Sequence, residues 1–188
     1  MSFLSDLDIV GTALEQQVAR ARARAVPVLA QRPLATLIEE LRLDHFARQG
    51  GLEGEALRDF MARYLGTIIN LHQPGYMGHQ VAVPHHGSAL GALIDGLTNN
   101  PMAIYEMGPG AAAIEYFVLN WMLAWIGWVP APLEPGRLGE SEHGGGVLTH
   151  GGSLANLTAL IAARTARRPD AWREGCPQDL ALLAPGNN

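Results

Sequence analysis

The pattern that most constrains the fold lies between residues 146 and 183 of this 188-residue chain. Residues 146–149 form a short apolar run that is typical of a buried strand, and residues 180–183 form a second one. Residues 154–168, between the two runs, are predicted to be helical. Because consecutive parallel strands need such a crossover, the order strand, helix, strand predicts a βαβ unit and an α/β fold.

The rest of the chain is predicted to be helical, with two long loops. Apolar residues at helical spacing predict helices over 5–24, 33–50, 57–68, 84–98 and 111–127. Proline and glycine predict loops over 70–83 and 130–146. The first helix should pack through Leu14, Val18, Ala21 and Ala25. The last should turn inward Ile114, Phe117, Val118, Trp121, Leu123 and Trp125. We therefore expect a helical amino-terminal segment, residues 1–70, followed by a larger domain from residue 71.

Composition excludes several classes of protein. Hydrophobic residues make up 48% of the chain, which suffices for a core, and the net charge of -5 argues against a nucleic-acid-binding protein. A single cysteine allows no intrachain disulfide and no cysteine-based zinc site. The sequence begins without a signal peptide and has no run long enough for a membrane span. A cytoplasmic protein without membrane contact is the resulting expectation.

The motif that carries chemistry is the turn between the first predicted strand and its helix, with the sequence His-Gly-Gly-Ser-Leu-Ala-Asn over 150–156. Unpaired N–H groups and the helix dipole favour an anion at such a helix start. Gly151 and Gly152 allow close backbone approach, Ser153 can cap the helix and offer its hydroxyl, and Asn156 lies one turn further. An ordinary serine-capped turn explains the same residues. Neither a P-loop nor a dinucleotide fingerprint is present, which argues against ATP and NAD.

Other chemistry-bearing residues have simpler explanations. Four histidines, His72, His79, His85 and His86, could suggest a metal site, but imidazoles in a Pro/Gly loop more often form local hydrogen bonds. Tryptophans spaced four and three apart, at 121, 125 and 128, favour core or dimer packing over a cofactor box. Glu106 and Glu115 have no reason to meet, so one is expected to be an interface or cap residue. The sequence offers no base to activate the Cys176 thiol, which argues against a nucleophilic role for it.

Three blocks in the same order resemble the group II pyridoxal-phosphate decarboxylases, which include glutamate, aromatic amino acid and diaminobutyrate decarboxylases. They are LHQPGYMGHQ at 71–80, NNPMAIYEMGP at 99–109 with Glu115 and Trp121 beyond it, and GGVLTHGGSLANLTAL at 145–160. The resemblance implies a fold type I large domain that is incomplete in this chain and covers 71–188. It also implies a reaction in which an amino acid forms an external aldimine with pyridoxal 5'-phosphate, loses CO2 and is reprotonated.

The resemblance also assigns site residues. Gly151, Gly152 and Ser153 match the segment that contacts the cofactor phosphate, and Asn156 matches a polar position beside it. His79 and Gln80 match the segment that borders the substrate side chain, where an imidazole and an amide would favour a polar or acidic amino acid. Tyr105 matches an interface segment near the neighbouring active site.

The chain contains no lysine, since all thirteen of its basic residues are arginines. Pyridoxal-phosphate enzymes need a lysine to bond the cofactor aldehyde. The resemblance therefore implies a second polypeptide that carries the lysine and the rest of the large domain, and a homodimer of such pairs.

The ending at Gly186-Asn187-Asn188 is compatible with self-cleavage after asparagine, proteolysis, truncation or separate genes. Two other functions stay open: another fold type I enzyme, such as a carbon–carbon lyase or an aminotransferase-like enzyme, and an inert pyridoxal-phosphate-fold subunit.

Overall fold

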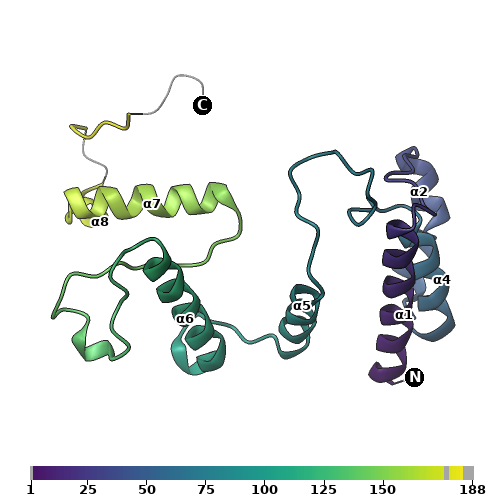
Figure 1. Cartoon of the computed structure of the whole chain (residues 1–188), viewed down its shortest axis with the longest axis horizontal. Coiled ribbons are helices and arrows are strands. Elements are labelled where there is room, and N and C mark those ends of the chain that lie inside the picture. The colour runs from purple at the N-terminus through teal and green to yellow at the C-terminus, as the bar shows by residue number, and fades with distance from the viewer. Residues whose placement is uncertain (1, 176–177, 184–188) are drawn as a thin grey trace. The chain divides into compact units, whose positions relative to one another are not determined.

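The computed structural model describes residues 2–175 and 178–183, and the chain divides into two compact units, residues 1–94 and 95–188. The ribbon is shown in Figure 1. Cys176 and the asparagines at 187 and 188 lie outside the described residues. The division at residue 71 concerned the domains of the complete enzyme and stays a prediction.

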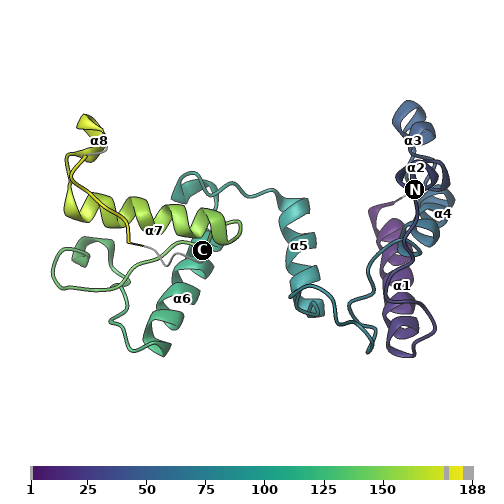
Figure 2. The ribbon, with the colours of Figure 1, turned by 90° about the horizontal axis from the view of Figure 1, so that it is seen from above.

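The first unit is built on a pair of helices, α1 (Phe3–Arg22) and α4 (Gly54–Leu65), which lie side by side in Figures 1 and 2. A capping box starts α1, because the Ser5 N–H donates to Ser2 Oγ and the Ser2 N–H donates to Ser5 Oγ. The predicted helix is confirmed and ends before Pro27. Of the residues predicted to pack, Ala21 is buried but Leu14 is 43% exposed, so the packing face of α1 was only partly predicted.

The helix predicted over 33–50 is wrong as a single element. The structure has two helices there, α2 (Leu34–Glu40) and α3 (Leu43–Gln49). They are separated because Arg42 adopts a φ of 55°, and a residue in the left-handed region cannot continue an α-helix. The glycine at the end of α3 was correctly expected, since Gly50 has a φ of 63°.

Buried polar contacts fasten the loops of the first unit to α1. Gln17 and Asn70 are the two buried polar side chains among the described residues of this unit. Gln17 Nε2 donates to Asn70 Oδ1 at 2.7 Å and to the Leu65 carbonyl at 3.2 Å. Asn70 Nδ2 donates to the Pro27 carbonyl at 2.8 Å. The beginning of the predicted loop over 70–83 is therefore held by α1, through Gln17, and by the segment after α1, through Pro27.

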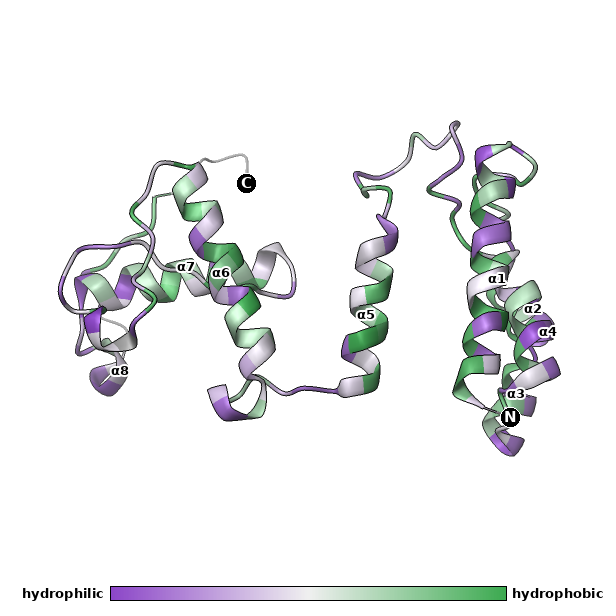
Figure 3. Ribbon diagram, turned by 60° about the horizontal axis from the view of Figure 1, so that its bottom comes forward, coloured by the Kyte–Doolittle hydropathy of each residue, from purple (hydrophilic) through white to green (hydrophobic). Residues whose placement is uncertain are grey.

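The helix α5 (His86–Thr98) contains the boundary between the two units and confirms the prediction over 84–98. Its apolar side chains are largely exposed, at 56% for Leu90, 63% for Ile94 and 65% for Leu97. Figure 3 shows this helix as predominantly hydrophobic. In the part of the chain that the structure describes, no helix combines the length and apolar character that a membrane crossing needs.

The second unit contains a 3-10 helix, η1 (Tyr105–Met107), the long helix α6 (Pro109–Trp125), a second 3-10 helix, η2 (Pro135–Arg137), and the helices α7 (Gly152–Arg167) and α8 (Ala171–Glu174). Proline starts α6, at a position where its missing N–H costs nothing. Both long helices confirm predictions from the sequence, whereas α8 was not anticipated.

The inward face predicted for α6 is wrong for most of its residues. Leu123 is 8% exposed, but Phe117 is 67% and Trp125 is 77% exposed. Within the described residues the second unit buries few large side chains, so this apolar helix has little to pack against. The Trp121 and Trp125 rings contact each other, with centroids 4.9 Å apart.

The βαβ unit is not confirmed, because none of the described residues forms a strand. The helix α7 is present, but residues 146–149 and 180–183 have no regular structure. The physical reason is visible at residue 148, whose backbone N–H donates to the side chain of Glu115 rather than to a neighbouring strand. A strand exists only with a partner that accepts and donates along its length.

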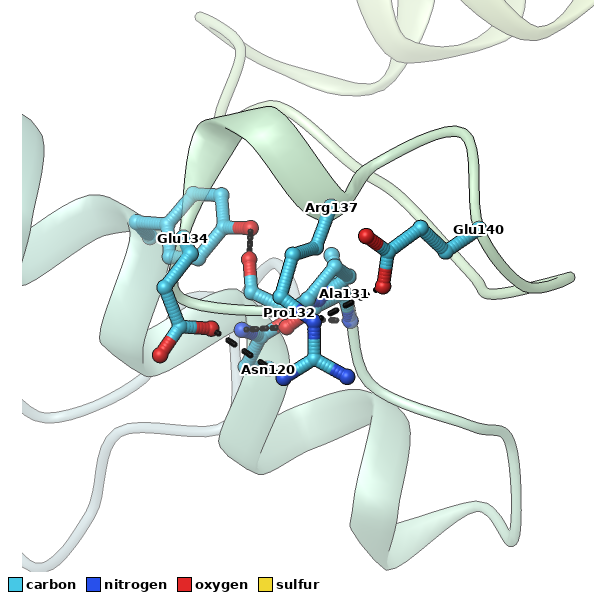
Figure 4. A network of polar contacts seen from close by, with 7 residues as sticks. Asn120, Ala131, Pro132, Glu134, Arg137 and Glu140 are labelled. Atoms are coloured by element: carbon cyan, nitrogen blue, oxygen red, sulfur yellow. Dashed lines mark hydrogen bonds and ion pairs between the residues drawn. The ribbon is translucent and has the colours of Figure 1, made fainter.

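Side chains of α6 hold the segment that follows it (Figure 4). The Asn120 amide donates to the Ala131 carbonyl at 2.9 Å and accepts from the Ala131 N–H at 3.0 Å. The Tyr116 hydroxyl donates to the Pro132 carbonyl at 2.5 Å. Arg137, in η2, forms ion pairs with two glutamates of the same loop. These are Glu134 and Glu140.

Candidate functional site

The candidate site is the turn that leads into α7. Gly151 is the N-cap residue, with a φ of 88° and a ψ of 166°. That combination is essentially restricted to glycine. The helix begins at Gly152, so Ser153 is the second helical residue and its hydroxyl makes no capping hydrogen bond. The expectation that Ser153 caps the helix is wrong, because the capping position lies before the first helical residue and is taken by glycine.

The absence of a side-chain cap leaves the start of α7 open to a ligand. Gly151, Gly152, Ser153 and Asn156 are all exposed. A methyl group built on Gly151 or on Gly152 would meet no other atom within 4 Å. N–H groups in the first turn of a helix have no partner inside the helix, and they carry its positive dipole end. The turn therefore offers uncapped donors, a serine hydroxyl and room for a tetrahedral anion.

Glu115 supports the segment that enters this turn. Its Oε1 accepts the Leu148 N–H at 2.7 Å, three residues before Gly151. From the sequence, one of Glu106 and Glu115 was expected to be an interface or cap residue, but the hydrogen bond between Glu115 and Leu148 was not predicted. The sequence feature that could have indicated this contact is that Glu115 is the one acidic residue in the largely apolar helix α6.

The residues expected at the substrate lie in both units, and their role stays a prediction. His79 and Gln80 are exposed in the loop of the first unit, where the Tyr76 hydroxyl donates to the His79 carbonyl at 2.8 Å. Tyr105 belongs to the second unit, in η1, and is 65% exposed. Gly151, Gly152, Ser153 and Asn156 are brought together simply because they share one turn and the start of one helix.

The other sequence candidates form no site among the described residues. No group of three or more His, Cys, Asp or Glu side chains there could hold a metal ion. The rings of His85 and His86 contact each other, with centroids 4.2 Å apart, and His85 Nδ1 accepts the Gly87 N–H. An open hollow of about 370 Å³ beside α6 is lined almost entirely by apolar atoms, from Leu119, Trp121, Met122, Leu123, Trp125, Ile126, Gly145 and Gly146. It is unsuited to an anion.

Comparison with known proteins identifies the family to which the region around this turn belongs. Residues 56–184, more than half of the chain, match the family described as the pyridoxal-dependent decarboxylase conserved domain. The L-aspartate decarboxylase of Metarhizium robertsii is 24% identical over 121 residues, which cover 64% of this chain and 22% of that protein. The chain thus matches about a fifth of this relative's length. The family match includes α5, α6, α7 and the turn at 151–153, and the chain belongs to the pyridoxal-dependent decarboxylase family, whose cofactor is pyridoxal 5'-phosphate.

Proposed function

We propose that this chain supplies the phosphate-binding part of a pyridoxal-phosphate-dependent amino acid decarboxylase. The observation that carries the proposal is the uncapped, glycine-led start of α7 inside the region that matches the family. The residues fit the phosphate end of the cofactor. Donors are exposed, no side chain occupies the capping position, and open space surrounds both glycines.

The chain's own residues would bind and orient the cofactor. Backbone N–H groups at Gly152 and Ser153 would donate to phosphate oxygens, together with the Ser153 hydroxyl. Asn156, one helical turn further, would present its amide on the same side. When bound, pyridoxal phosphate supplies an electron sink for the carbanion left by loss of CO2. By holding the phosphate, Gly152 and Ser153 would fix the orientation of the cofactor toward a bound substrate, which would make the reaction effectively intramolecular.

The proposed substrate is an acidic amino acid. His79 and Gln80 would border its side chain, and Tyr105 would help to enclose it. No Asp or Glu occurs between residues 60 and 94, a segment that holds four histidines, so a second carboxylate would meet no like charge from that segment. The L-aspartate decarboxylase among the relatives acts, by its name, on such an amino acid.

The lysine that bonds the cofactor aldehyde must come from outside this sequence, because the sequence contains none. We propose that a second polypeptide carries it together with the rest of the large domain, and that two such pairs form a homodimer. The exposed apolar residues of α5 and α6 support a partner of this kind. Residues 146–149 and 180–183 would become strands once neighbouring strands are present.

The test is product analysis with the assembled protein and a panel of amino acids in the presence of pyridoxal phosphate. We expect CO2 and amine from aspartate or glutamate at a kcat/KM at least tenfold above that for aromatic amino acids. Keto acid formation without CO2 would instead identify an aminotransferase-like enzyme. An assembly that takes up no cofactor would identify an inert subunit and contradict the proposal.

A further inference from the structure

The segment before the phosphate turn runs along one face of α6. A methyl group on Gly144 would lie 2.9 Å from Leu123 Cδ2, and one on Gly146 would lie 3.2 Å from Leu119 Cδ2. A methyl group on Gly145, between them, would meet no atom within 4 Å. The backbone therefore touches α6 at every second residue and faces away from it in between.

The contact points on α6 are spaced four residues apart. The contacts pair Gly144 with Leu123, Gly146 with Leu119, and residue 148 with Glu115. The residue number rises along the segment while it falls along α6, so the segment runs antiparallel to the helix. Four helical residues rise about 6 Å and two extended residues rise about 6.6 Å. These two spacings agree closely enough for three successive contacts to stay in register.

The last of the three contacts is polar and directional. Glu115 Oε1 accepts the Leu148 N–H at 2.7 Å, within the range of a well-formed hydrogen bond. The leucine contacts limit how close the segment comes, but apolar contacts tolerate sliding. A hydrogen bond to one particular N–H fixes which residue lies opposite Glu115, and hence where the turn begins three residues later.

From this register we infer that Glu115 is a positioning residue, which holds Leu148 and thereby sets the place of the Gly151–Ser153 turn. The consequence for cofactor binding rests on the proposed function. The Glu115 carboxylate acts through the backbone, because it accepts one particular N–H from a fixed position on α6.

The experiment compares Glu115→Ala with Glu115→Gln and with a matched control on the same helix, Asn120→Ala. The glutamine keeps an acceptor oxygen, whereas the alanine does not. Asn120→Ala also removes side-chain hydrogen bonds to backbone, but those to Ala131 rather than to the segment before the turn. All variants are made in the assembled protein, with two readouts: the dissociation constant of pyridoxal phosphate, and amide hydrogen exchange over residues 147–154.

We expect Glu115→Ala to raise the dissociation constant about tenfold or more, the value of one hydrogen bond to a charged group. Exchange at Leu148 should be faster by a similar factor. Glu115→Gln should stay within about threefold of wild type in both readouts, since it keeps the acceptor. Asn120→Ala should lower the melting temperature while leaving the dissociation constant unchanged.

Three results would overturn the inference: unchanged exchange at Leu148 in Glu115→Ala, equal cofactor affinity in Glu115→Ala and wild type, or the same loss of affinity in Asn120→Ala. A wild-type assembly that binds no pyridoxal phosphate would instead contradict the proposed function. The exchange data would still decide whether Glu115 holds the segment. Should Glu115→Ala fail to fold, Gly146→Ala and its control Gly145→Ala test the same register, because only the first crowds α6.

Discussion

Gly151→Ala and Gly152→Ala should separate backbone strain from cofactor contact at the start of α7. Gly151 has a φ of 88° and a ψ of 166°, and a methyl group there would meet no atom within 4 Å. The cost of alanine at Gly151 is therefore purely conformational, about 1–3 kcal/mol of folding free energy. Gly152 lies within the helix, where alanine costs nothing and can add up to about 1 kcal/mol of stability.

Cofactor binding should respond differently from stability. A methyl group at Gly152 would stand where the phosphate has to approach the backbone, so we expect the affinity for pyridoxal phosphate to fall at least about tenfold, which corresponds to 1.4 kcal/mol. Gly151→Ala should lower both stability and affinity. Urea denaturation without cofactor measures the first quantity, and titration with pyridoxal phosphate measures the second. The reasoning is refuted if Gly151→Ala is as stable as wild type, or if Gly152→Ala binds the cofactor as tightly as wild type.

Three further changes test contacts within the two units. Asn70→Ala should lower the free energy of unfolding by about 1–3 kcal/mol in urea denaturation, since it removes one buried and one partly buried hydrogen bond, although Gln17 keeps its bond to the Leu65 carbonyl; a loss under 0.5 kcal/mol would contradict this. The Arg63 guanidinium lowers the pKa of Asp59 by hydrogen bonding and charge, so stability from this pair is present above the ordinary Asp pKa of about 3.9 and is lost on acidification below it. Asp59→Asn should then differ from wild type at pH 7 and converge with it once the pH falls through the lowered pKa of Asp59, as acid titration of unfolding would show. Leu123→Ala should expose the segment at 144–146 to faster amide exchange, because it removes the side chain that this segment touches; unchanged exchange would argue against close packing there.

The long helices were predictable from sequence because their apolar spacing and their ends are encoded locally. Pro27 and Pro33 bound the first two helical regions, and Gly50 ends α3 as expected. The break at Arg42 was not predictable, since arginine is a good helix former and its φ of 55° is set by the surroundings. The turn at 151–153 was identified from its glycines, although the helix begins at Gly152, two residues earlier than a serine cap at 153 would require.

Contacts between distant residues were beyond the sequence patterns. The hydrogen bond from Leu148 to Glu115 spans 33 positions, and that from Gln17 to Asn70 spans 53. The strands over 146–149 and 180–183 were predicted from apolar runs, but a run encodes a strand only where partners exist. The same cause explains the exposure of Trp125: an apolar helix face indicates burial without indicating what buries it.

The central claim is that the turn at Gly151, Gly152 and Ser153 binds the phosphate of pyridoxal phosphate, and comparison of that cofactor with pyridoxal tests it most directly. Pyridoxal lacks the phosphate but keeps the ring and the aldehyde. The account predicts that the assembled protein binds pyridoxal phosphate at least about a hundredfold more tightly, from two or more charge-assisted hydrogen bonds. It also predicts that Gly152→Ala and Ser153→Ala shrink this preference at least about tenfold without weakening pyridoxal binding. Equal affinity for both compounds, or a preference that both variants retain in full, would contradict it.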